Sequence, residues 1–151
     1  EITTTVATED LIKQAVQNYT TAYHGCWAAP ASCKPEEFTA ERGHSRSTLT
    51  ELATGMAAQG LYFSTDLRGS YLINESVNLE SAGEAAAVFC VYDAAPVMGP
   101  LGPDGQPTVV NDQVLSLRNQ YRLFLEGDAW KVGEQLQLEV LGEGNLCPPA
   151  A

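Results

Sequence analysis

Three polar residues on the expected inner face of a β-sheet are the first candidates for chemistry in this sequence. Glu75, Asn119 and Glu134 each fall within a run in which every second residue is apolar. Alternate side chains of a strand share a face, so these three should point inward with their apolar neighbours. Two carboxylates and an amide on a buried face are unexpected unless they are solvated, paired or functional.

A carboxylate among apolar and phenolic groups has a raised pKa, which suits a general base near neutral pH. The sharpest hypothesis is that Glu75 or Glu134 abstracts a proton. A tyrosine hydroxyl would then steady the developing oxyanion, and the candidates are Tyr19, Tyr23 and Tyr92.

A turn at Gly127-Asp128 would set Tyr121 opposite Glu134 on the next strand. Two other interpretations remain open. In the first, a bulge at Gly133 turns Glu134 outward, and Glu75 lies at a solvent-exposed rim. In the second, the same residues line a pocket that binds a ligand without catalysis.

Motifs and charge exclude several classes of function. The sequence contains no nucleophile elbow, phosphate-binding glycine loop or dinucleotide fingerprint, and we expect no cofactor. It has no Cys-x-x-Cys, and His24 and His44 lack partners at zinc spacing, so no metal site is expected. The net charge of -11, with only eight Lys and Arg, argues against nucleic acid as a partner. No apolar run reaches the ~20 residues of a membrane-spanning helix.

Four cysteines predict two disulfides, with four free thiols as the alternative. Of the three connectivities, we favour Cys26–Cys33, which closes a short loop around Pro30, with Cys90–Cys147, which ties the tail to a buried strand. The first residue is Glu1, which predicts a removed signal peptide or a trimmed product. We therefore expect a secreted or cell-envelope protein, either free or anchored by a segment that this chain lacks.

Helical spacing dominates the first 60 residues. Thr8, followed by two acidic residues, is expected to cap a long amphipathic helix that runs to Pro30. Pro35 should open a short helix, and residues 47–59 should form another that stops at Gly60.

Alternation with period two follows Gly60, and it predicts four strands with a weaker one before them. On the first of these four strands, the side chains that should face the core are Tyr71, Ile73, Val77 and Leu79. The expected strands cover residues 61–64, 71–79, 86–92, 115–125 and 130–140. Residues 94–112, rich in Pro and Gly, should form a long loop with Val97, Met98 and Leu101 at an apolar tip.

These elements predict an α+β fold in one domain, residues 1–151 with a core of about 6–147. The N-terminal helices would pack on one face of a curved antiparallel sheet of four to five strands, stapled by two disulfides.

This pattern resembles the cone-shaped nuclear transport factor 2-like superfamily, and within it exported actinobacterial proteins of unknown function. The likeness covers roughly residues 6–147 and is carried by Tyr19, Tyr23, Ala86-x-Val88-x-Cys90, Asp93, Asp104-Gly105, Arg122, Asp128-x-Trp130-x-Val132 and Cys147. The resemblance implies the Cys90–Cys147 pair and a pocket between helices and sheet. It implies no reaction, because this fold carries enzymes and non-catalytic modules alike.

Three functions are therefore carried forward. The first is an exported, non-enzymatic domain that binds a small apolar ligand or an envelope protein in the cleft. The second is a small isomerase, cyclase or hydrolase that uses pocket carboxylates. The third is an interaction domain, including a homodimer, that uses the sheet face or the Pro-rich loop.

Overall fold

The computed structural model describes residues 2–148, with side chains from residue 8 onward. Glu1, on which the prediction of a removed leader rests, lies outside the described residues. The helices are α1 (Ile2–Ala28) and α2 (Ser45–Gln59), joined by two short 3-10 helices, η1 (Pro30–Ser32) and η2 (Pro35–Glu37). The α1 helix begins before Thr8, so the prediction that Thr8 caps it was wrong.

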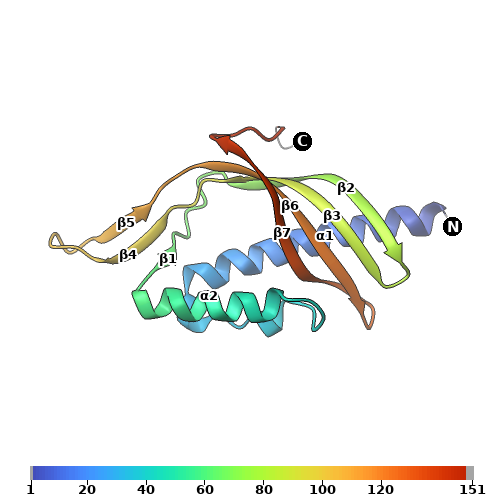
Figure 1. The fold of residues 1–151 in the computed structure, drawn as a ribbon, viewed down its shortest axis with the longest axis horizontal. Helices are drawn as coiled ribbons and strands as arrows, with labels where there is room; N and C mark the ends of the chain where they lie inside the picture. The colour runs from blue at the N-terminus through green and yellow to red at the C-terminus, as the bar shows by residue number, and fades with distance from the viewer. Residues whose placement is uncertain (1, 149–151) are drawn as a thin grey trace.

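Four long strands form one antiparallel sheet in the order β2-β3-β6-β7. Their bounds are Tyr71–Ser81 for β2, Glu84–Asp93 for β3, Leu115–Glu126 for β6 and Ala129–Glu143 for β7. Figure 1 shows the sheet bending over α1, with α2 beside α1 on the same side. The predicted α+β class and helix layer are thus confirmed.

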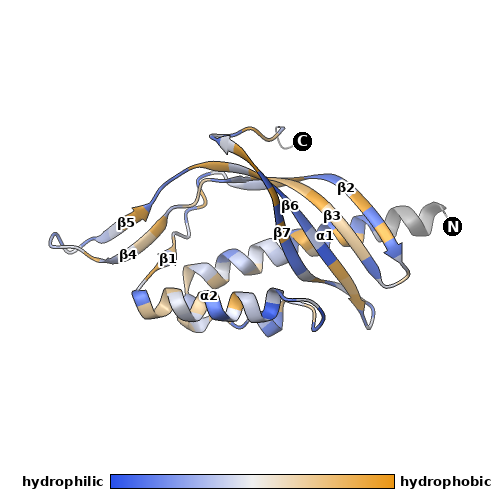
Figure 2. Cartoon of the chain, viewed as in Figure 1, coloured by the Kyte–Doolittle hydropathy of each residue, from blue (hydrophilic) through white to orange (hydrophobic). Residues whose placement is uncertain are grey.

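The core lies between α1, α2 and the inner face of this sheet. Ile12 and Val16 on α1 are fully buried against Phe89 on β3 and Leu123 on β6. The central strand β3 is coloured hydrophobic over much of its length in Figure 2, whereas β2 at the sheet edge alternates between hydrophobic and hydrophilic bands. This difference follows from position, because an edge strand keeps more of its surface in water.

The Pro- and Gly-rich segment contains a β-hairpin, so the prediction of an irregular loop was wrong. β4 (Val97–Leu101) pairs with β5 (Pro107–Asn111), and β4 also pairs with the short β1 (Tyr62–Phe63) to make a second sheet. The hairpin extends away from the main sheet in Figure 1. Its turn residue Gly105 has a φ of 76°, a conformation that favours glycine.

Both predicted disulfides are present, Cys26–Cys33 and Cys90–Cys147. The second pins the C-terminal tail to β3 at the centre of the sheet. The tail is held further by Ser116, whose hydroxyl donates to the carbonyl of Gly144 and accepts from the amide of Leu146. Gly60 ends α2 with a φ of 69°, as the sequence predicts.

Candidate functional site

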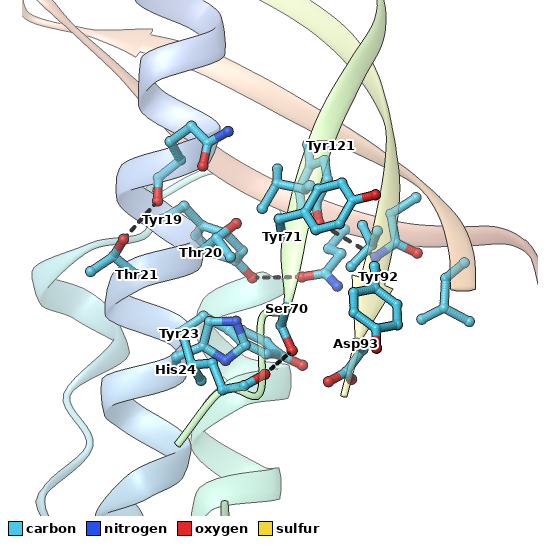
Figure 3. Close-up of a pocket in the computed structure, with 17 residues that line it drawn as sticks. Tyr19, Thr20, Thr21, Tyr23, His24, Ser70, Tyr71, Tyr92, Asp93 and Tyr121 are labelled. Carbon is cyan, nitrogen blue, oxygen red and sulfur yellow. Dashed lines mark hydrogen bonds between the residues drawn. The ribbon is translucent and has the colours of Figure 1, made fainter. Parts of the chain in front are cut away.

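A cavity of about 330 Å³ lies between α1 and the sheet. Helix α1 supplies one wall, and β2, β3 and β6 supply the other (Figure 3). Among the described residues, five tyrosines line it, together with one aspartate, one histidine and no lysine or arginine. The full lining is Gln17, Tyr19, Thr20, Thr21, Tyr23, His24, Leu67, Ser70, Tyr71, Leu72, Val91, Tyr92, Asp93, Leu117, Asn119, Tyr121 and Gln135.

Two buried tyrosines form the inner end of the cavity. Tyr19 on α1 and Tyr121 on β6 meet edge to face, with ring centroids 6.1 Å apart, and each is 3% exposed. The Tyr19 hydroxyl donates to Oε1 of Gln135 at 3.1 Å. Burial raises the pKa of Tyr121 to about 12 and raises the pKa of Tyr19 as well. Both therefore stay neutral phenols at physiological pH and serve as hydrogen-bonding groups.

Asn119 lies beside them on β6 and is 4% exposed. Its Nδ2 donates to the hydroxyl of Tyr121 at 3.4 Å, while its Oδ1 is buried with no partner among the described residues. Buried polar atoms are nearly always paired with protein or with a bound molecule. The unpaired oxygen thus marks a position that a donor from water or a ligand would complete.

The opposite end of the cavity holds Asp93, the only carboxylate among the lining residues that the structure describes. His24 and Tyr23 face it from α1 (Figure 3). Oδ1 of Asp93 accepts a hydrogen bond from the amide of Ala95 at 3.2 Å. Burial raises the pKa of Asp93, and burial lowers the pKa of His24. His24 is therefore neutral near pH 7, and its Nδ1 is a second buried atom without a partner in the described part of the chain.

Tyr71 and Tyr92 line this end from paired positions on β2 and β3, on the sheet face that also carries the C-terminal tail. Their ring centroids are 5.7 Å apart and their planes are inclined at 55°. The Tyr71 hydroxyl donates to the carbonyl of Pro148 at 2.7 Å. Because the disulfide between Cys90 and Cys147 fixes the tail, it also fixes the acceptor that orients Tyr71.

A second cavity, of about 410 Å³, lies between α2 and β7. Tyr19, Tyr23 and Gln135 line both cavities, so they form the partition between them. Two apolar side chains at its mouth, Leu52 and Leu136, are more than half exposed. The first and second cavities therefore adjoin each other and share Tyr19, Tyr23 and Gln135 as a wall.

The structure brings most of the predicted site residues together. Tyr19, Tyr23, Tyr92, Asn119 and Tyr121 all line the first cavity, and the inward orientation predicted for Asn119 is confirmed.

Glu75 lies elsewhere, and its predicted inward orientation was wrong. It sits at a bulge where the β2–β3 register shifts between Asn74 and Ser76. It makes two bonds with Arg118, from Nε at 2.7 Å and from Nη2 at 3.2 Å. The hydrogen bond from Arg118 lowers the pKa of Glu75, which is the reverse of the shift a general base needs. The bulge also puts Leu72, in place of Tyr71 and Ile73, on the core side with Val77.

Glu134 does not face Tyr121 as predicted. The β6–β7 register skips Gly133, so Glu134 pairs with Arg122 and Gln135 takes the place opposite Tyr121. Glu134 lies 4.0 Å from Nε of Arg122 and lines the second cavity. This is the bulge at Gly133 that the sequence analysis left as an alternative.

Sequence reasoning missed Asp93, His24 and Gln135 as lining residues. The available signal for His24 was its spacing on α1, one turn after Thr20, which places both on one helix face. Asp93 ends β3, and nothing in the sequence shows that this strand end meets the C-terminal turns of α1. Among residues 8–148, no three His, Cys, Asp or Glu side chains gather as metal ligands would.

Comparisons with known proteins define the fold only. The class is a two-layer α+β fold in which two helices cover one face of a four-stranded antiparallel sheet. The intermembrane space region of the chloroplast protein ARC6 has a similar structure, with a TM-score of 0.57 and 18% sequence identity over 83% of this chain and 95% of that chain. No protein-family model matches the sequence, and no curated protein does.

Proposed function

We propose that this protein is an exported, non-enzymatic module that binds a small organic molecule in the cavity between α1 and the sheet. The observation that carries the proposal is the 330 Å³ space walled by buried tyrosines and by Asn119, whose Oδ1 has no partner among the described residues. Small-molecule sites are typically concave, mostly apolar and furnished with a few fixed polar groups. The cavity has each of these features.

The proposal that this protein is exported rests on its disulfides. Both pairs are formed, and disulfides persist in oxidising environments outside the cytosol. The similar region of ARC6 is named for an intermembrane space, which is also outside the cytosol. None of the helices in residues 2–148 has the length and apolar character needed to cross a bilayer.

We also propose kinship with the nuclear transport factor 2-like cone. A long helix against the concave side of a bent antiparallel sheet, with a pocket between them, supports this assignment.

A cavity-filling variant tests the binding function. Leu117 lines the cavity from β6, so Leu117→Trp should occupy the space. We expect wild-type protein to increase the fluorescence of the apolar dye 1-N-phenylnaphthylamine and this variant to lose that increase. Leu138→Trp is the matched control, because Leu138 is 45% exposed and lines neither cavity. Equal dye binding by both variants would contradict the proposal.

A second candidate function is proton transfer by Asp93, in place of the glutamates first considered. It is favoured by one observation, a carboxylate that lines the cavity near Tyr23 and whose pKa is raised by burial. A base of this kind would catalyse solvent deuterium uptake into added carbonyl compounds, and Asp93→Asn would abolish it. If the wild-type protein gives only the buffer rate, the enzymatic candidate is removed and the binding function stands.

A further inference from the structure

One wall separates the two cavities beside the helices, and its three side chains differ in how freely they can move. Tyr19 is 3% exposed and contacts the rings of Tyr23 and Tyr121. Tyr23 in turn meets the ring of Trp27 edge to face, with centroids 5.2 Å apart. Gln135 is the exposed member of the wall. Its side chain can therefore leave the wall while both tyrosines stay packed.

The bond that holds Gln135 in the wall can be broken without leaving a buried group unpaired. The bulge at Gly133 sets Gln135 opposite Tyr121, on the sheet face turned toward α1. From there its Oε1 accepts the hydroxyl of Tyr19 at 3.1 Å. The side chain of Ser45 on α2 is a second hydrogen-bonding neighbour of that hydroxyl. Rotation of the Gln135 amide toward water thus avoids the penalty of an orphaned phenol.

The second cavity offers apolar surface that the rest of the chain leaves uncovered. Leu52 on α2 and Leu136 on β7 line it and are 51% and 58% exposed. Covering apolar surface favours binding roughly in proportion to its area. The first cavity, at about 330 Å³, lies near the lower end of the ~300–1,000 Å³ usual for ligand pockets. A ligand that passed Gln135 would gain the adjoining 410 Å³ and cover both leucines.

We infer that Gln135 is a specificity-determining residue, a movable wall that admits an elongated apolar ligand from the first cavity into the second. The ligand class is a long aliphatic chain, with one end beside Tyr121 and the other between Leu52 and Leu136. This inference rests on the proposed binding function and names its ligand class.

A series of straight-chain alcohols from 1-hexanol to 1-dodecanol tests the inference. Their affinities are measured by displacement of 1-N-phenylnaphthylamine from the folded protein. Each added methylene should tighten binding roughly fourfold through the whole series, because each one is buried in one of the two cavities. The methyl signals of Leu52 in NMR spectra should shift with 1-dodecanol and stay in place with 1-hexanol.

Two substitutions should act on the long alcohol alone. Gln135→Ala removes the movable side chain and its bond to Tyr19, so 1-dodecanol should bind about fivefold tighter. Leu52→Asp puts a carboxylate where the chain would end, so 1-dodecanol should bind about tenfold more weakly. Gln120→Ala is the matched control for the first, because Gln120 lies on β6 and lines neither cavity. It should leave both alcohols unchanged.

The outcomes separate this inference from the function on which it rests. An affinity that stops rising along the series, Leu52 signals that respond alike to both alcohols, or variants that change both alcohols equally would overturn the movable wall. So would alcohols that fail to displace the bound dye. In each of these cases dye binding still supports the first cavity as a site. Absence of the dye signal from the wild-type protein would instead remove the binding function itself.

Discussion

The backbones of Gly43 and Gly133 touch, and this contact sets the register of the candidate site. A Cβ on Gly43 would lie 2.2 Å from the carbonyl oxygen of Gly133, and a Cβ on Gly133 would lie 2.3 Å from that of Arg42. Gly133 is also the residue skipped in the β6–β7 register, so it allows Gln135 to take the place opposite Tyr121.

Gly133→Ala should therefore destabilise the protein. The added methyl also meets the Phe124 ring at 2.5 Å, and overpacking of this kind costs about 1–3 kcal/mol. Urea unfolding measures the loss. Gly55→Ala is the control, because its Cβ would have nothing within 4 Å and an α-helix gains about 0.8 kcal/mol from the exchange. A Gly133→Ala variant as stable as wild type would contradict the close packing described here.

The same bulges explain what sequence reasoning could and could not predict. The helices, the four long strands, the turn at Gly127-Asp128 and the Cys26–Cys33 pair follow from local spacing and turn chemistry. The Cys90–Cys147 pair was favoured because it ties the tail to a buried strand and because the family resemblance implies it. A bulge adds one residue and exchanges the two faces of the strand beyond it, so Glu75 and Glu134 were placed on the wrong face. The β4–β5 hairpin was missed because its prolines and glycines hide the alternation.

The candidate site was predictable to the extent that it depends on helix spacing. Tyr19 and Tyr23 lie one turn apart on α1 and both reach the cavity. Asp93 was not predictable as their partner, because the meeting of a strand end with a helix depends on how the layers pack.

Arg118 should control the titration of Glu75. Its guanidinium bonds both oxygens of Glu75 and also pairs with Glu139, so it holds the pKa of Glu75 below the ordinary value. Glu75 thus contributes stability above its unfolded-state pKa, which is lost as pH falls through the lower folded value. In Arg118→Gln, NMR should show the Glu75 pKa returning upward. A Glu75 titration that is unchanged by this substitution would refute the pairing.

The two disulfides should differ in how much they stabilise the folded protein. Cys90–Cys147 spans 57 residues and Cys26–Cys33 spans 7, so the chain-entropy model assigns them about 4 and about 2.5 kcal/mol. Replacing each pair by alanines should therefore lower the melting temperature more for Cys90 and Cys147. That variant should also free the tail, which the ring signals of Tyr71 would report. A lower melting temperature for the variant without Cys26–Cys33 than for the variant without Cys90–Cys147 would contradict the larger stabilisation assigned to Cys90–Cys147.

Asp93 should destabilise the folded protein at neutral pH. Its folded-state pKa is raised above the ordinary 3.8, mainly by burial, so the folded protein binds this proton more tightly than the unfolded chain does. The resulting stability is fully present below pH of about 4 and is lost as pH rises through the folded pKa. Asp93→Asn has no carboxyl group to ionise, so it does not lose this stability as pH rises. The free energy of unfolding of Asp93→Asn minus that of wild type should therefore be larger at pH 7 than at pH 3.5.

Two comparisons make the Asp93 measurement specific. Asp112→Asn, in an exposed position, should show no such growth in stability between pH 3.5 and pH 7. Two titratable groups of α1, His24 and Tyr23, lie near Asp93, and Tyr23 stays neutral in this pH range because burial raises its pKa. His24 is therefore the neighbour among the described residues whose own titration could contribute. Repeating the comparison in a His24→Gln background removes that contribution. A difference in unfolding free energy that shrinks as pH rises would contradict this prediction, because it would mean that interactions of the Asp93 carboxylate in the folded protein outweigh the cost of its burial.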